Sequence, residues 1–365
     1  MKLSKWILFP AAFFLGEALS LRAELLVSSF NSNRVLRYNE TNGAFIDVFI
    51  PNTNGFLSLP HGLAFGPDNN LYVASAGNDC VMRYNGTNGA FIDTFVAGGS
   101  GGLDYPVALI FRPDGFLYVS SQLNDRVLRF NSTNGSFVDA FVANSAALDG
   151  PSDMVFGPDG NLYVVGRFNN RVVRYNGTNG AFMDVFASSN LAQPFGLRFG
   201  GDGHLYVASG NNNSVQRFNG TNGALLSTVV TNGGGSLNLP IGLLFGPDGN
   251  LYVASFNNNK VARFVPSNGG YLGDFVASGN GGLNGPNFMI FRPAAAPTLT
   301  ISVADANAAL MWATNATGFS LQTTTGVSTN ATWASVTNAV VVAGGSNVVT
   351  LPFSAVDHFF RLIGP

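Results

Sequence analysis

The feature that most constrains the fold is an internal repeat. The tripeptide Leu-Tyr-Val recurs along the chain at intervals of 43 to 46 residues, and Leu25-Leu26-Val27 forms an earlier copy. A proline before an apolar run follows the same period. The tripeptides begin at Leu25, Leu71, Leu117, Leu162, Leu205 and Leu251, and the prolines are Pro60, Pro106, Pro151, Pro194, Pro240 and Pro286. Such a period is typical of architectures in which each repeat is one supersecondary unit.

Each repeat predicts four short strands, as the copy from Pro151 to Ala187 illustrates. Its strands are expected at 153–156, 162–165, 172–175 and 182–186. Gly157-Pro158-Asp159-Gly160 has the residues of a type I turn. Asn176-Gly177-Thr178-Asn179-Gly180 supplies residues that tolerate positive φ, which indicates a hairpin. Helical spacing appears nowhere, so the chain is expected to be all-β.

Six units of four strands predict a six-bladed β-propeller. The first copy lacks its proline-led inner strand because Leu25 stands at its start, and an extra segment, 286–293, follows the last copy. We expect this C-terminal inner strand to complete the N-terminal blade and to close the ring. Closure would hide the strand edges that an open array exposes.

The unit that runs from Leu59 to Ser75 and on through Asn78-Asp79-Cys80-Val81 resembles an NHL repeat. Its Pro-x-Gly, Pro-Asp-Gly, Leu-Tyr-Val-Ala and Asn-x-x-Val elements recur in register over residues 24–293. One departure is consistent. The family's usual aspartate after the second strand is replaced by Ser29, Ser75, Ser121, Gly166, Ser209 and Ser255. This replacement argues against a site built on that carboxylate.

Residues 1–23 have the pattern of a secretory signal peptide. Lys2 and Lys5 precede an apolar run from Trp6 to Leu19, which is too short to span a bilayer. Cleavage after Ser20 or after Ala23 fits the small residues there, and we favour Ala23. No second apolar stretch of membrane length follows. We therefore expect a secreted, periplasmic or cell-surface protein without a transmembrane segment after cleavage.

Composition excludes several classes of protein. The 18 basic and 20 acidic side chains nearly cancel, which argues against a nucleic-acid partner. The single cysteine, Cys80, excludes a disulfide scaffold and a cysteine-ligated metal site, and we expect it to be a buried, unreactive thiol.

After Pro297 the sequence becomes poor in charge and rich in Thr, Ala, Val and Asn. Alternating apolar residues predict a small β-sandwich over 298–365, with 294–297 as a linker. The segments Leu310-Met311-Trp312, 318–323 and 359–362 resemble fibronectin-like modules that end many exported proteins of the Verrucomicrobia and related bacteria. The resemblance implies a surface-sorting or adhesive role, and a plain structural cap is an equal alternative.

The candidate ligand site is the mouth, the end of the ring at which the inner strands begin. Residues just after each proline should surround it. These residues differ from copy to copy, whereas the turns at the opposite end are nearly identical, so the mouth is the better candidate for a ligand site. These candidates are His61, Val107, Ser152, Asp153, Phe195, Ile241 and Asn287. Asparagine-rich loops on the same side are expected to serve turn geometry, with carbohydrate or peptide binding as the alternative.

Catalytic residues are sparse at this mouth. The three histidines fall in different places, at the mouth (His61), in a turn of the opposite face (His204) and in the tail (His358). Related calcium-dependent lactonases cluster several oxygen ligands in the channel. Here Asp153 is the carboxylate at the ring, with Asn287 and the loop residues Asp104 and Asp149 as its helpers. A streptogramin-lyase-like enzyme would use His61 as general base, but the expected second histidine is missing.

Arginines of the third strands and aspartates of the fourth strands recur at fixed spacing. We interpret them as ion pairs within each blade rather than as binding sites. The arginines are Arg37, Arg83, Arg129, Arg174, Arg217 and Arg263, and the aspartates are Asp47, Asp93, Asp139, Asp184 and Asp274, with Ser227 in the fifth blade.

Together these features predict an exported, monomeric and non-catalytic propeller without a cofactor. It would bind a peptide, a glycan or a protein at its mouth. The alternative is an extracellular lactonase, hydrolase or lyase that uses His61, Asp153 and Asn287 around Ca²⁺ or another divalent cation.

Overall fold

The computed structural model describes residues 24–53, 55–144, 146–292, 299–304, 307–313, 319–325, 332–352 and 358–363. The predicted signal peptide, 1–23, and linker, 294–297, lie outside the described residues. Contacts divide the chain into two compact units. One is Ala23–Pro293, and the other contains the C-terminal residues 294–365.

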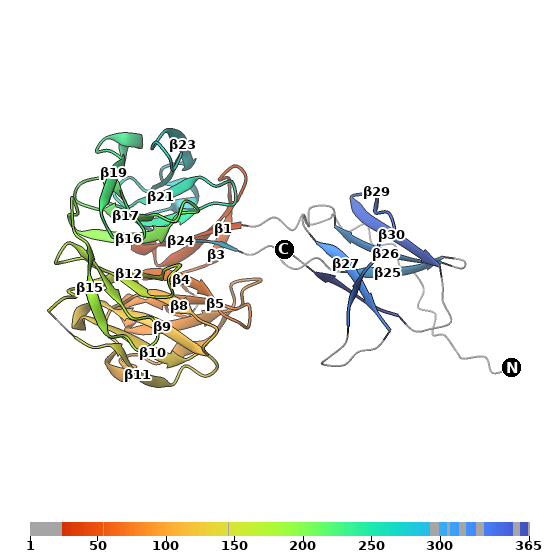
Figure 1. The fold of residues 1–365 in the computed structure, drawn as a ribbon, viewed down its shortest axis with the longest axis horizontal. Coiled ribbons are helices and arrows are strands. Elements are labelled where there is room, and N and C mark those ends of the chain that lie inside the picture. Colours follow the sequence, from red (N-terminus) through yellow and green to blue (C-terminus); the bar gives the residue numbers. More distant parts are fainter. Residues whose placement is uncertain are drawn as a thin grey trace. The chain divides into compact units, whose positions relative to one another are not determined.

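The first unit consists of six four-stranded antiparallel sheets, in agreement with the predicted all-β propeller (Figure 1). The first sheet has the order β24 (Pro286–Arg292), β1 (Glu24–Ser29), β2 (Arg34–Asn39) and β3 (Phe45–Ile50). The second contains β4 (Pro60–Phe65), β5 (Leu71–Ser75), β6 (Cys80–Tyr84) and β7 (Phe91–Val96), and the third contains β8 (Pro106–Phe111), β9 (Phe116–Ser121), β10 (Arg126–Asn131) and β11 (Phe137–Val142). The fourth contains β12 (Pro151–Phe156), β13 (Leu162–Gly166), β14 (Arg171–Tyr175) and β15 (Phe182–Ala187), and the fifth contains β16 (Pro194–Phe199), β17 (Leu205–Ser209), β18 (Ser214–Phe218) and β19 (Leu225–Val230). The sixth contains β20 (Pro240–Phe245), β21 (Leu251–Ser255), β22 (Lys260–Phe264) and β23 (Tyr271–Val276).

The helical elements among the described residues are three-residue 3₁₀ turns in the loops. They are η1 (Phe30–Ser32), η2 (Ala76–Asn78), η3 (Ser100–Gly102), η4 (Gln122–Asn124), η5 (Gly234–Ser236) and η6 (Asn280–Gly282). No helix in the described part of the chain is long and apolar enough to cross a membrane.

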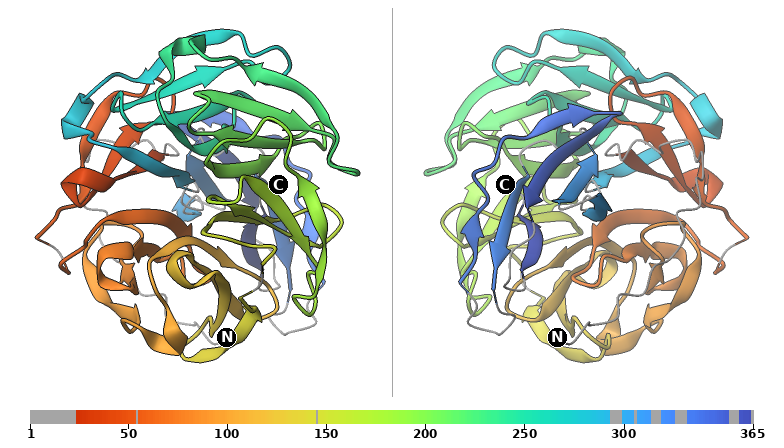
Figure 2. Two further views of the ribbon diagram at one scale, coloured as in Figure 1. Left: turned by 90° about the vertical axis from the view of Figure 1, so that its left-hand side faces the viewer. Right: turned by 90° about the vertical axis from the view of Figure 1, so that its right-hand side faces the viewer.

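The innermost strands form a closed ring. Each lies beside two others, in the cyclic order β4, β8, β12, β16, β20, β24 and back to β4. In Figure 2 the colours run once around this ring, and the red first strands lie between the orange second sheet and the cyan sixth sheet. The apolar side chains of neighbouring sheets share clusters, such as Tyr72 with Leu109 and Tyr163 with Leu197. The core therefore runs between the faces of successive sheets.

Strand β24 closes the ring, as the sequence predicts. It pairs antiparallel with β1, with Leu25 opposite Phe291 and Val27 opposite Met289. The Ser28 hydroxyl accepts a hydrogen bond from the Phe288 N–H at 2.9 Å. Pairing within one sheet thus joins the two ends of the propeller segment.

An asparagine or aspartate side chain ties each sheet to the next. It follows the loop between the second and third strands and has left-handed backbone geometry, with φ between 48° and 59°. Its Oδ1 accepts the N–H of the residue before the proline of the following sheet, at 2.7 to 2.9 Å. The pairs are Asn33 with Leu59, Asp79 with Tyr105, Asp125 with Gly150, Asn170 with Gln193, Asn213 with Leu239 and Asn259 with Gly285. Asparagine and aspartate tolerate this backbone geometry better than other non-glycine residues.

The serines that replace the NHL aspartate also have a structural role. All five serine hydroxyls accept a backbone N–H from the segment that leads to the inner strand, at 2.9 to 3.0 Å, and Gly166 of the fourth sheet has no hydroxyl. These serines are Ser29, Ser75, Ser121, Ser209 and Ser255. In five of the sheets this segment is therefore held by side chains of its own sheet and of the preceding sheet, and in the fourth sheet by Asp125 of the preceding sheet.

Four of the predicted intrablade ion pairs are confirmed. They are Arg37–Asp47, Arg83–Asp93, Arg129–Asp139 and Arg174–Asp184.

The fifth predicted pair, Arg263 with Asp274, is wrong. Gly273 lies opposite Arg263, so Asp274 falls one register position further and contacts Lys260 at 2.8 Å. Arg263 pairs with Asp248 instead, and Arg217, opposite Ser227, pairs with Asp202. In these two sheets the arginine thus pairs with the aspartate of the turn before the second strand, because the residue opposite it on the fourth strand is not acidic.

Cys80 is buried and free, as predicted. Burial raises the pKa of its thiol to about 11. The thiol is therefore protonated at neutral pH, in keeping with an unreactive side chain.

The C-terminal unit contains two sheets. One has the order β25 (Thr300–Ala304), β26 (Asn307–Ala313), β30 (Ser346–Pro352) and β29 (Val341–Ala343), and the other has the order β28 (Ala334–Ser335), β27 (Ser320–Thr324) and β31 (Phe359–Ile363). Leu310, Trp312 and Val349 of the first sheet share one apolar cluster with Leu321 of the second. The two sheets therefore enclose a common core.

Removal of β24 should open the ring. A chain of residues 24–285 would leave the inner edge of β1 unpaired, so we expect aggregation and a lower melting temperature than for residues 24–293. Light scattering after gel filtration and a circular-dichroism melt measure both effects. The longer fragment controls for loss of the C-terminal unit. A monomeric short fragment with an unchanged melting temperature would contradict the closure.

The inter-sheet hydrogen bonds should each contribute to stability. Replacement of Asn213 by Ala removes the acceptor for Leu239 N–H and places Ala in left-handed geometry, so we expect a loss of about 1–2 kcal/mol in unfolding free energy. Asn213→Gly keeps the geometry and should lose less. Asn211→Ala, two residues earlier in the same loop, should change stability by less than about 0.5 kcal/mol. Equal denaturation midpoints for the two alanine variants would refute the assignment.

Candidate functional site

The mouth is built from two loop segments of each sheet that hydrogen-bond to each other. The loop after the second strand donates its N–H groups to the segment before the inner strand. Examples are Gln122 N–H to the Tyr105 carbonyl and Arg167 N–H to the Gly150 carbonyl, both at 3.1 Å. These loops therefore lie over the start of the inner strands.

The predicted ring residues lie beneath this cover. Each is at most 5% exposed. They are His61, Val107, Ser152, Asp153, Phe195, Ile241 and Asn287. The sequence predicts these residues around the mouth, and in the structure they are buried beneath the residues just before the prolines, such as Tyr105 and Leu239. Four of these have positive φ without being glycine, and they partly cover the ring: Leu59 (48°), Tyr105 (53°), Gln193 (43°) and Leu239 (55°).

An apolar plug closes the channel just below the mouth. It consists of Val107, Phe195, Ile241 and Phe288 from four different inner strands. Tyr105, Leu239 and Phe256 pack against it from the loops. The mouth is thus a shallow surface above the plug and not the entrance of an open pore.

His61 is held by two polar neighbours. Its Nδ1 lies 2.7 Å from Asn287 Nδ2, and its Nε2 lies 3.4 Å from the Tyr105 hydroxyl. Burial, together with the charge of Arg167, lowers the pKa of His61 to about 3, although the hydrogen bond with Asn287 raises it. His61 is therefore neutral at physiological pH and a weak base, which does not suit general-base catalysis.

Arg167 is the cation nearest this cluster, and sequence reasoning missed it. Its guanidinium lies 4.0 Å from the centre of the Phe195 ring and 5.2 Å from that of Phe168. Its Nε is buried without a hydrogen-bond partner among the described residues. No described carboxylate forms an ion pair with it, and burial lowers its pKa.

A comparison of the copies could have revealed Arg167. It follows the second strand of the fourth sheet, and the equivalent residues are Phe30, Ala76, Gln122, Gly210 and Phe256. Arg167 is the single charged residue of this set. Because we assigned these loop residues to turn geometry, we did not identify Arg167 as a candidate from the sequence.

Large apolar side chains are exposed on the same loops. Phe56 is 84% exposed, Leu123 59% and Phe168 46%. Phe56 lies beside the loop of the second sheet, where its carbonyl accepts a hydrogen bond from Asn78 Nδ2 at 2.8 Å. Leu123 and Phe168 occupy equivalent positions in the third and fourth sheets. The three residues belong to three consecutive sheets on the mouth side, and we call them the apolar arc.

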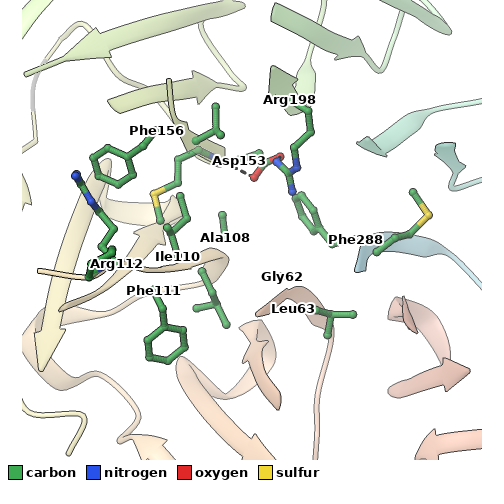
Figure 3. Close-up of a pocket in the computed structure, with 15 residues that line it drawn as sticks. Gly62, Leu63, Ala108, Ile110, Phe111, Arg112, Asp153, Phe156, Arg198 and Phe288 are labelled. Carbon is green, nitrogen blue, oxygen red and sulfur yellow. Dashed lines mark hydrogen bonds and ion pairs between the residues drawn. The ribbon is translucent and has the colours of Figure 1, made fainter. Parts of the chain in front are cut away.

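The third to sixth residues of the inner strands line a cavity on the other side of the plug. It has a volume of about 450 Å³ and extends to the turn at Arg112 and Pro113 (Figure 3). Most of its wall is apolar, from residues such as Ala108, Ile110 and Phe288. Because Phe288 belongs to both the plug and the cavity wall, the plug separates the cavity from the mouth.

Asp153 lines this cavity rather than the mouth. Its Oδ2 accepts hydrogen bonds from Arg198 Nη1 at 2.6 Å and from Leu197 N–H at 3.1 Å, and its Oδ1 accepts one from Met154 N–H at 2.9 Å. Figure 3 shows Asp153 and Arg198 facing each other across the wall. Burial raises the pKa of Asp153, while Arg198 and the two N–H groups lower it. Both carboxylate oxygens therefore already have donors.

Of the residues of the enzyme alternative, the structure brings His61 and Asn287 into contact, whereas Asp153 contacts Arg198. Asp104 and Asp149 contribute to the loops through their backbone, because their carbonyls accept the N–H groups of Leu123 and Phe168. Across the described residues, no group of three or more His, Cys, Asp or Glu side chains could hold a metal ion.

Comparison with known proteins identifies the fold but not a family. No protein-family model matches the sequence, and no curated protein matches it. A chain in the crystal structure of the nidogen/laminin complex is similar, with a TM-score of 0.61, 16% identity and coverage of 74% of this chain and 99% of that chain. Our protein is therefore a β-propeller.

Two enzymes have the same fold at similarly low identity. Virginiamycin B lyase from Staphylococcus aureus gives a TM-score of 0.51 with 15% identity, covering 79% of this chain and 87% of that one. The gluconolactonase of Xanthomonas campestris gives 0.52 with 20% identity, covering 64% and 79%. Propellers of this kind thus include both enzymes and a component of a protein complex, so function must be argued from the site.

The buried neutral His61 should make the protein less stable in acid. In the unfolded chain a histidine takes up a proton below about pH 6.5, whereas folded His61 stays neutral down to about pH 3. Stability should therefore fall as the pH drops through this window, by about 3 kcal/mol at about pH 4.5 from this group.

Urea denaturation across this pH range measures the effect. The variant His61→Gln should show a shallower pH dependence than wild type. His204→Gln, in a turn of the fifth sheet, is the matched control. Parallel curves for wild type and His61→Gln would show that His61 does not contribute.

Proposed function

We propose that this chain is an exported, non-catalytic NHL-type propeller of six blades whose mouth binds a peptide or protein partner. The observation that carries the proposal is the apolar arc formed by Phe56, Leu123 and Phe168. Exposed apolar patches on soluble proteins often mark interaction sites. Aromatic residues and arginine are also enriched at protein–protein interfaces, and Arg167 adjoins the arc.

The apolar arc differs from the other exposed apolar residues. Pairs such as Ile46 with Phe45 and Ile92 with Phe91 recur at the start of the outer strands, so they belong to the repeat itself. The arc is not repeated. The residues equivalent to Leu123 and Phe168 in the other sheets are Asn31, Gly77, Asn211 and Asn257. A feature confined to one side of a symmetric ring is what binding of an asymmetric partner requires.

The chemistry around the ring supports binding rather than catalysis. His61 is neutral and engaged by Asn287 and Tyr105, and Asp153 is neutralised by Arg198. Peptide or protein is favoured over glycan because the exposed residues of the arc are apolar and lack hydrogen-bonding groups. The proposal requires no metal or other cofactor.

The remaining parts of the chain fit this role. Residues 1–23 would direct export, so that the mature protein is secreted, periplasmic or held at the cell surface. The C-terminal unit, 298–365, would be a fibronectin-like β-sandwich that positions the propeller. We propose that the mature protein is a monomer.

Peptide binding provides the test. A displayed library of random peptides is selected on the mature wild-type protein, and the affinity of the best peptide is measured by calorimetry. The double variant Leu123→Ser, Phe168→Ser should weaken binding at least about tenfold, which corresponds to 1.4 kcal/mol. The reason is the loss of apolar area buried against the peptide.

Leu226→Ser serves as the control because Leu226 is 45% exposed on the outer strand of the fifth sheet. It should leave the affinity unchanged, and all variants should keep the wild-type melting temperature. Equal affinities for wild type and the double variant, or an equal loss in Leu226→Ser, would refute the mouth as the binding surface.

A further inference from the structure

Arg167 combines three properties that point to a missing anionic partner. Its guanidinium stacks on Phe195, it is partly removed from water, and it has no ion pair with any described carboxylate. Partial burial weakens the hydration of the cation without supplying a counter-charge. The aromatic faces hold the guanidinium plane in place. Its five N–H donors are thus oriented before any ligand arrives.

A second donor, the Tyr105 hydroxyl, belongs to a side chain that packs against the same plug as Arg167. Asn287 Nδ2 lies 2.7 Å from His61 Nδ1, and the Tyr105 hydroxyl lies 3.4 Å from His61 Nε2. At 3.4 Å this contact is long for a hydrogen bond, so the Tyr105 hydroxyl can donate to a ligand. The charge of Arg167 acts on both neighbours, because it lowers the pKa of His61 and opposes the rise that burial causes for Tyr105. Arg167 and Tyr105 therefore form a pair of donors above the plug.

We infer that Arg167 and Tyr105 form a subsite for a carboxylate group at the mouth. This inference rests on the proposed function, because it names the chemistry by which a peptide would be recognised there. The flat guanidinium matches a carboxylate through two parallel hydrogen bonds. The subsite takes a carboxylate attached to an apolar or aromatic body, such as the C-terminal residue of a peptide.

The surroundings favour a carboxylate over a dianion. The mouth segments next to Tyr105 and Gly150 carry Asp104 and Asp149, which would repel a doubly charged phosphate. One guanidinium and one neutral hydroxyl balance a single negative charge. Phe168 and Phe195 provide apolar faces for the group that carries the carboxylate.

A pair of small probes tests the inference on the mature full-length protein. N-acetyl-L-phenylalanine carries the carboxylate, and N-acetyl-L-phenylalanine amide replaces it with a neutral group of the same shape. Binding is followed by ligand-observed NMR and calorimetry. We expect the acid to bind with a millimolar dissociation constant and the amide to bind at least about tenfold more weakly. Equal binding of both probes, or no binding of the acid at millimolar concentration, would overturn the inference.

Three variants locate the subsite. Arg167→Met keeps the apolar stem but removes the charge, and it should weaken acid binding about tenfold or more. Tyr105→Phe removes the hydroxyl alone and should weaken it about threefold to tenfold. Arg171→Met is the control, because Arg171 lies four residues further on and forms no ion pair with a described residue. Loss of acid binding in the control equal to that in Arg167→Met would overturn the assignment.

The outcomes separate this inference from the proposed function. If Arg167→Met binds the acid as wild type does, the subsite is refuted, while peptide binding that depends on Leu123 and Phe168 still stands. If the serine double variant keeps peptide affinity but the acid and amide still differ through Arg167, the peptide-binding proposal fails and the carboxylate subsite remains. Should Arg167→Met fail to fold, the comparison of acid with amide on wild type decides alone.

Discussion

The antiparallel pairing of β24 with β1 joins side chains and backbone groups separated by 260 positions in the sequence. Without it the first sheet lacks its innermost strand, and the ring of inner strands has a gap. With it, each inner strand has a neighbour on both sides, so the apolar faces of successive sheets are covered all around the axis. The plug depends on the same closure, because Phe288 belongs to β24.

The closed ring determines where ligands can bind. The residues before the prolines are held in left-handed geometry by the asparagine and aspartate side chains of the preceding sheet, and this geometry places them over the channel. The consequence is two separate environments along one axis. Above the plug lies a surface with exposed apolar residues and Arg167, and below it lies a cavity whose buried carboxylate, Asp153, is neutralised by Arg198.

Periodic features of the sequence were sufficient to predict the architecture. The spacing of Leu-Tyr-Val, the turn residues and the extra segment 286–293 gave the strands and the closure because each reflects local backbone geometry. The site was harder to predict. The period places His61 and Asp153 at neighbouring positions of their inner strands. It does not predict on which side of the plug each side chain lies. A single shift in strand register moved Asp274 from Arg263 to Lys260, and only pairing partners reveal such a shift.

The hydrogen bonds between sheets have an evolutionary consequence. Every repeat carries an acceptor for the sheet that follows, in its asparagine or aspartate, and a donor for the sheet that precedes, in the N–H before its proline. A unit duplicated in tandem would therefore match both of its new neighbours from the start, with no compensating substitution. The number of units is limited by closure instead, since the terminal strand must still reach the first sheet. Such a chain can grow by tandem duplication of the gene segment that encodes one repeat, while individual loops diverge in sequence toward new ligands.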